Sequence, residues 1–147
     1  MKQIIFLSLI ISLIIGSCTQ QEIKSSNEGA WKVVSWKSMK GDTVTMEFPG
    51  KITGSEMKII SNNNFLWVGR YKSDTTFFDN YGGGTIKIDG NHVEETELYC
   101  VDQSAVGSTI RILWEEKNDT ATQSWPCDEK WQLKKDNYFI QKWVRIK

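Results

Sequence analysis

The sequence predicts an all-β protein: a single antiparallel up-and-down β-barrel of about 8–9 strands that follows an N-terminal targeting segment. Three observations lead to this prediction. Short runs alternate between apolar and polar residues, as strands with one buried face do. Glycine, asparagine and aspartate separate these runs at short spacing, which is typical of hairpin turns. No stretch after the targeting segment has a convincing helical period.

Residues 1–17 have the pattern of a signal peptide. Lys2 supplies a positive charge, and the apolar run Ile4 to Ile15 is too short to favour a membrane-spanning helix. The segment ends Ile15-Gly16-Ser17-Cys18, which resembles a bacterial lipobox. The resemblance implies cleavage before Cys18, its lipidation, and a membrane-anchored protein on the periplasmic or outward side of the outer membrane. The alternative is an ordinary secretory signal beside a cysteine.

Two further segments follow, residues 18–28 and 29–147. The first contains Cys18 and a polar stretch that we interpret as a flexible tether. The second has the length of one domain. The whole chain has 18 basic and 18 acidic side chains, so it lacks the excess of positive charge that is typical of nucleic-acid-binding domains. These features predict no nucleic-acid partner.

The domain divides into strands in order, beginning at a tryptophan. Turns such as Gly41-Asp42 and Pro49-Gly50 set their limits. The predicted strands cover 31–36, 42–48, 57–60, 65–71, the two arms of a hairpin within 81–100, 109–116, 121–125, 131–134 and 138–146.

The hairpin within residues 81–100 is the clearest element. A two-residue loop at Gly90-Asn91 pairs Ile88 with Val93 and Ile86 with Glu95, and it places the apolar residues together on one face. A loop at Asp89-Gly90 changes the pairs but keeps the same faces. Three glycines precede the first arm, and we expect them to let the backbone bend at a barrel corner.

The hairpin also contains the acidic residues that we consider candidates for a ligand site. In either register Glu95 and Glu97 share a face with Val93 and Tyr99. If this face is the lumen, the two carboxylates need partners, and we name Arg70 and Arg111 because both lie within apolar strands. The alternative is a bulge after Val93, which would turn both acids towards water.

The aromatic residues supply further candidates for lumen lining. We expect Trp67, Trp114 and Tyr99 to contribute to a ligand-binding surface in the barrel, because a small barrel is filled or lined by such side chains. No catalytic residue is predicted: His92, the single histidine, lies at a turn without a neighbouring nucleophile motif. We also predict no metal and no cofactor, because His92 and the cysteines lack a recognised ligand spacing.

Two cysteines remain beyond Cys18. An exported protein meets oxidising conditions, so the sequence predicts a disulfide between Cys100 and Cys127. The alternative is that both are unpaired and behave as small hydrophobic residues.

The start of the domain, Gly29-Ala30-Trp31, resembles the G-x-W opening of lipocalins. In that family the tryptophan plugs the closed end of the barrel, and an arginine on the last strand packs over it. Arg145 stands at the corresponding place here. The stretch from Met57 to Val68, followed by the glycines and a glutamate after the next turn, also resembles a family of small lipocalin-like lipoproteins of uncharacterised function from Gram-negative bacteria.

The resemblance implies a barrel that binds a small, partly apolar ligand without catalysis. The alternative function is a cell-surface protein-interaction or inhibitor module whose barrel is filled by its own side chains, with a protein partner in place of the ligand. An enzyme that uses Glu95 or Glu97 is a third hypothesis, which would require a strongly raised carboxyl pKa in a cleft.

Overall fold

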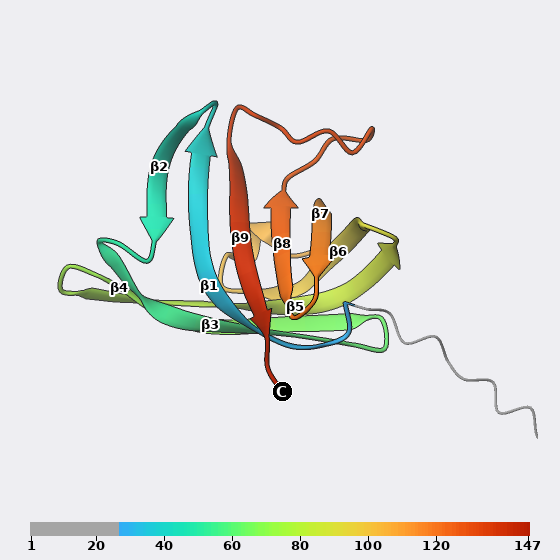
Figure 1. Cartoon of the computed structure of the whole chain (residues 1–147), viewed down its shortest axis with the longest axis horizontal. Coiled ribbons are helices and arrows are strands. Elements are labelled where there is room, and N and C mark those ends of the chain that lie inside the picture. Colours follow the sequence, from blue (N-terminus) through green and yellow to red (C-terminus); the bar gives the residue numbers. More distant parts are fainter. Residues whose placement is uncertain (1–26) are drawn as a thin grey trace, which may run out of the picture.

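The structure is a computed structural model that describes residues 27–147 (Figure 1). The predicted signal peptide, the lipidation at Cys18 and nearly all of the tether lie outside these residues. The described part contains nine strands and one short 3₁₀ helix. They are β1 (Gly29–Lys40), β2 (Thr43–Phe48), β3 (Ile52–Ser61), β4 (Asn64–Ser73), β5 (Thr76–Asp89), β6 (His92–Cys100), η1 (Gln103–Ala105), β7 (Thr109–Lys117), β8 (Thr120–Trp125) and β9 (Tyr138–Arg145).

The predicted antiparallel barrel is confirmed. Within residues 27–147, β3 to β9 pair in sequence order, and β1 closes the barrel by pairing with both β3 and β9. The first residues of β1 pair with β3, whereas its last residues pair with β2, which is the one strand outside the closed ring. In Figure 1, β1, β9 and β8 stand side by side and β3 and β4 run across their lower ends.

The hairpin of β5 and β6 has the first of the two registers that the sequence allows. Ile88 faces Val93 and Ile86 faces Glu95 across a loop at Gly90-Asn91. Gly90 has a φ of +60°, a backbone conformation that a turn of this kind requires and that glycine adopts without strain.

The glycines before this hairpin allow close approach rather than only a bend. A Cβ atom at Gly84 would lie 1.9 Å from the carbonyl oxygen of Thr96, and one at Gly82 would lie 2.2 Å from the ring of Trp67. The register shifts between Gly83 and Gly84, so that β6 has one residue more than β5 at this point. The bulge therefore follows Glu97 instead of Val93.

One predicted strand is absent from the described chain. Residues 131–134 consist of a bend at Trp131 and irregular chain, with a single bridge between Cys127 and Leu133. Trp131 has a φ of +61°, which interrupts an extended strand, and its ring stacks on His92 at 4.1 Å between centroids. The alternation in this stretch was too short to distinguish a strand from a loop that packs on the barrel.

Part of the hydrophobic core fills the half of the barrel in which β1 begins, and the rest of it extends towards the other end through Trp36, Phe48 and Tyr71. Trp31 is fully buried and meets Trp114 edge to face, with 5.3 Å between ring centroids. The guanidinium of Arg145 lies 4.1 Å from the centroid of the Trp31 ring, which is the contact that the resemblance implies. Arg145 also donates to the side chain of Glu116 at 2.6 Å. This end of the barrel is therefore closed, and the space above it forms the candidate site.

Candidate functional site

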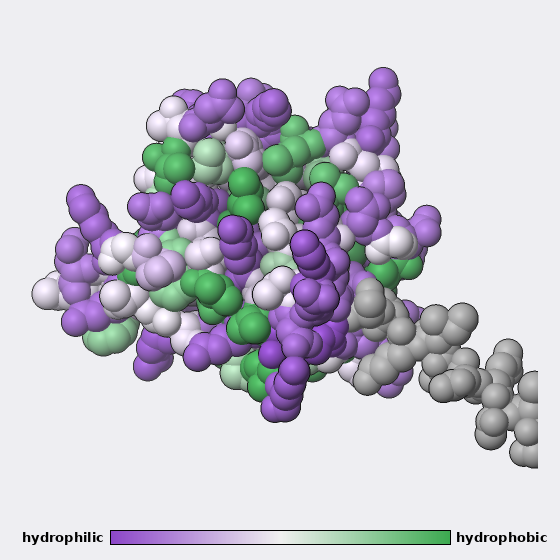
Figure 2. Space-filling model, viewed as in Figure 1, coloured by the Kyte–Doolittle hydropathy of each residue, from purple (hydrophilic) through white to green (hydrophobic). Residues whose placement is uncertain are grey.

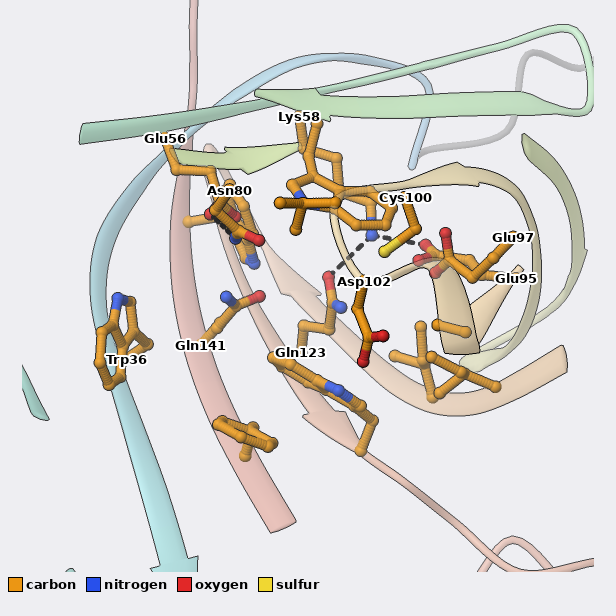
Figure 3. A pocket seen from close by; sticks show the side chains of 18 of the residues that line it. Trp36, Glu56, Lys58, Asn80, Glu95, Glu97, Cys100, Asp102, Gln123 and Gln141 are labelled. Carbon is orange, nitrogen blue, oxygen red and sulfur yellow. Dashed lines mark hydrogen bonds and ion pairs between the residues drawn. The ribbon is translucent and has the colours of Figure 1, made fainter. Parts of the chain in front are cut away.

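A cavity of about 460 Å³ occupies the other half of the barrel (Figure 3). Its lining comes from every strand of the closed ring because alternate residues of each strand point inward. The lining includes Trp36, Glu56, Lys58, Trp67, Tyr71, Asn80, Glu95, Glu97, Gln123, Trp125, Phe139 and Gln141. The cavity is thus lined by aromatic rings together with a polar cluster.

The centre of the polar cluster is a buried ion pair. The ammonium of Lys58 on β3 lies 2.5 Å from a carboxylate oxygen of Glu95 on β6, and both side chains are almost completely buried. The same ammonium donates to the side-chain oxygen of Gln123 on β8 at 3.0 Å. Three strands therefore contribute to one charge-neutral unit, and its partners offset part of the cost of burying two charges.

Glu97 lies beside this pair (Figure 3). It is 3% exposed, and its Oε2 atom makes no hydrogen bond among the described residues. Burial raises the pKa of Glu97 to about 7, the charge of Glu95 contributes in the same direction, and Lys58 opposes the shift. Glu97 is therefore a buried lumen carboxyl whose pKa is raised to about 7 and that has no hydrogen-bond donor among the described residues.

A second buried carboxyl group, that of Glu56, lies on β3 two residues before Lys58. It accepts hydrogen bonds from Asn80 at 2.5 Å and from the hydroxyl of Tyr71 at 3.3 Å. Burial raises the pKa of Glu56, and the hydrogen bond from Asn80 partly opposes this. Burial and the nearby Glu56 raise the pKa of Tyr71, so its hydroxyl stays protonated and remains a donor.

Stacked aromatic rings make up the apolar part of the wall. Trp125 and Phe139 stack with 5.1 Å between their centroids, and Trp67 stacks on Phe65 at 5.6 Å. Trp36 and Tyr71 meet edge to face. These contacts hold the rings in place, so the cavity presents flat apolar surfaces around the polar cluster.

The structure decides where the predicted acidic residues point. Glu95 and Glu97 are buried and line the cavity, and Trp67 lines it with them. Trp114 is buried below the cavity, in contact with Trp31, and does not line it. The alternative in which both acids face water is excluded because the bulge comes after Glu97.

The expected basic partners were wrong. Arg70 is exposed on the outer face of β4, where it pairs with Asp79 at 2.6 Å. Arg111 pairs with Glu94 on the outside of the barrel at 3.1 Å. Both residues lie at the outward positions of their strands, and Lys58 supplies the positive charge that Glu95 requires.

The prediction that Tyr99 lies in the lumen was also wrong. The bulge between Glu97 and Tyr99 shifts the alternation by one residue, so Tyr99 is 74% exposed and Cys100 lines the cavity instead. A bulge depends on the pairing with β5 and has no sequence signal within β6 alone.

The predicted disulfide is not formed: Cys100 and Cys127 are buried free thiols. The backbone N–H of Cys127 donates to the carbonyl oxygen of Arg111 on β7, and Arg111 is paired with Glu94 on β6. Cys100 lies six residues after Glu94, at the end of β6. Six residues of strand correspond to about 20 Å, well beyond the distance that a disulfide spans. Both residues match the alternative interpretation as small buried residues.

Sequence reasoning missed Lys58, Gln123 and Glu56. The signal available was the alternation of β3, in which Glu56, Lys58 and Ile60 share one face. The opposite face contains the apolar residues Met57 and Ile59, so alternation predicts that this face is buried. Their side chains are nevertheless 39% and 40% exposed. Nothing within this strand reveals that its polar face is the inner one.

The comparisons with known proteins give no family. No family model matches the chain, and no significant match was found among curated proteins. Residues 27–147 contain no helix of the length and apolar character needed to span a membrane. Over the same range no group of three or more histidine, cysteine or acidic side chains is arranged to hold a metal ion.

The raised pKa of Glu97 leads to a testable dependence of stability on pH. The folded-state pKa of about 7 exceeds the ordinary value of 4.5, so the folded protein binds this proton more tightly than the unfolded chain does. The stability that this proton provides is complete below pH 4.5 and is lost as the pH rises through 7.

We expect Glu97→Gln to remove this loss. Urea denaturation measures the free energy of unfolding of both proteins. The difference between Glu97→Gln and the wild type should be about 1–3 kcal/mol more favourable to the variant at pH 8 than at pH 4.5. The control Glu115→Gln, at an exposed position of β7, should show no such change with pH. An equal effect of Glu97→Gln at both pH values would contradict the assignment.

Proposed function

We propose that this chain is a membrane-anchored lipoprotein that binds a small, partly apolar molecule in its barrel without catalysis. The observation that supports the proposal is the cavity of about 460 Å³ with aromatic walls and a buried carboxyl, Glu97, that has no hydrogen-bond partner within residues 27–147. Sites for small molecules have volumes of about 300–1,000 Å³ and combine apolar walls with a few polar groups. The lipobox-like sequence that ends at Cys18 supports the anchor at the outer membrane.

The arrangement of the carboxyls favours binding over catalysis. Glu95 and Glu97 come from the same face of one strand, so they cannot lie on opposite sides of a bond between them. Glu95 is held by Lys58, and Glu56 is held by Asn80. Side chains that are fixed in this way can orient a ligand.

Native mass spectrometry of a gently purified soluble form that begins at Thr19 tests the proposal. All strands of the barrel and its core lie after this point, so the soluble form keeps the complete barrel. We expect an added small mass that is lost on denaturation. Gln141→Trp should remove it by filling the cavity, whereas Lys142→Trp, on the outer face of the same strand, should retain it.

Two results would contradict the proposal. An added mass that persists in Gln141→Trp would place the ligand outside the barrel. A spectrum without added mass, followed by a lack of binding when apolar and amphipathic compounds are titrated into the protein, would contradict ligand binding itself.

The outer surface favours a second candidate function, a protein-interaction module. Hydrophobic side chains of β3 to β6 remain exposed on the outside of the barrel, and register places several of them side by side. They are Met57, Ile59, Leu66, Val68, Tyr81, Leu98 and Tyr99. Hydrophobic groups also interrupt the hydrophilic surface in the view of Figure 2. Large exposed apolar areas commonly mark protein–protein contacts.

A further inference from the structure

The ionisable side chains that line the cavity are mainly acidic. Four carboxylic acids line it, Glu56, Glu95, Glu97 and Asp102, against the single ammonium of Lys58. From β5, β7, β8 and β9 the lining residues carry no charge. The remaining titratable side chains of the lining are Tyr71 and Cys100. The interior therefore has an excess of negative charge when its carboxyls are ionised.

Lys58 supplies the one positive charge that residues 27–147 place in the lumen, and this charge is already engaged. Lys58 contacts Glu95 at 2.5 Å and Gln123 at 3.0 Å. Its ammonium also lies 5.4 Å from the centroid of the Phe65 ring and 5.9 Å from that of Trp114. Because these contacts hold Lys58 at the base of the cavity, the described part of the chain offers no free cation there to an anionic ligand.

In contrast to the ammonium of Lys58, the carboxyl group of Glu97 is not engaged by any described side chain. It is almost fully buried, lines the cavity and has no donor among the described residues. Figure 3 shows it beside Glu95 at the edge of the cavity. A buried carboxyl oxygen without a partner is unfavourable, and an N–H group of a ligand would supply the missing hydrogen bond.

The aromatic walls suit the same kind of ligand. Trp36, Trp67 and Trp125 all line the space that contains the acidic cluster. Indole rings attract cations over their faces and also cover apolar groups. A cationic head and an apolar body would therefore both find matching surfaces within one cavity.

We infer that the barrel binds an organic cation, a protonated amine joined to an apolar or aromatic body, with the ammonium against the carboxylate of Glu97. This inference rests on the proposed function and adds the chemical class of the ligand. Because Glu95 is paired and Glu56 has its own donors, Glu97 is the group that distinguishes a cation from a neutral compound of the same shape.

Three matched probes test the inference: tryptamine, its neutral alcohol analogue tryptophol, and the anion indole-3-acetate. Isothermal titration calorimetry on the soluble form at pH 8 keeps tryptamine protonated and Glu97 largely ionised. We expect tryptamine to bind about tenfold or more tightly than tryptophol, because a hydrogen bond to a charged group is worth about that factor. Indole-3-acetate should bind most weakly.

Glu97→Gln should reduce the affinity for tryptamine to about that for tryptophol. The control Glu94→Gln alters the outer face of the same strand and should leave the preference intact. Equal affinities of the wild type for tryptamine and tryptophol would overturn the inference and leave the proposed function standing. A preference that survives in Glu97→Gln would also overturn it. If none of the three probes binds and native spectra show no added mass, both proposals fail.

Discussion

Replacing Lys58 by methionine should lower the free energy of unfolding by about 3–5 kcal/mol at neutral pH. The substitution keeps much of the volume of the side chain but leaves the Glu95 carboxylate buried without its cation. It also removes the donor to Gln123. Urea denaturation followed by tryptophan fluorescence measures the loss, with Lys32→Met at an exposed position of β1 as the control.

A double variant separates the loss of the pair from the loss of packing. If the cost comes from the uncompensated carboxylate, Lys58→Met combined with Glu95→Met should recover most of the stability, because no unpaired charge remains. Additive losses in the double variant would contradict this explanation. A Lys58→Met variant as stable as Lys32→Met would contradict the buried ion pair itself.

Trp31→Ala should be the second large effect, with a loss of about 3–5 kcal/mol. Trp31 is fully buried, its indole nitrogen donates to the backbone oxygen of Asn27 at 2.9 Å, and its ring contacts Trp114 and lies under Arg145. Truncation would leave a void at the closed end of the barrel that the surrounding strands cannot collapse to fill.

The matched control is Trp131→Ala, because this ring lies in the loop between β8 and β9 and is only partly buried. Guanidinium denaturation should show a much smaller loss for the control than for Trp31→Ala. Trp31→Phe should fall between the two because a smaller ring still fills part of the space. Similar losses for Trp31→Ala and Trp131→Ala would show that Trp31 has no special role in closing the barrel.

These two residues differ in how far the sequence predicted them. Trp31 and Arg145 are recognisable because Gly-x-Trp starts the domain and the arginine ends its last strand. Lys58 gives no such signal: it lies between Met57 and Ile59, so its strand can be read with either face inward. The choice depends on the pairing of β3 with β1 and β4, which strand alternation does not specify.

The candidate site was predicted in part for the same reason. Glu95 and Glu97 follow a short turn, so their positions relative to Ile86 and Ile88 result from local pairing. Their basic partner comes from β3, which lies far away in the sequence. Arg70 and Arg111 were reasonable candidates by alternation, but closure of the barrel places them outside.

The sequence by itself determined the features that depend on neighbouring residues: an all-β chain, several of its turns, and which residues of the hairpin around Gly90 share a face. Only the tertiary structure decided that Lys58 points inward, that Tyr99 points outward after a bulge, and that Cys100 and Cys127 remain apart. The physical reason is that turn chemistry and alternation act over a few residues. The lining of a barrel is instead determined by which face each strand turns inward when distant strands pair and the ring closes.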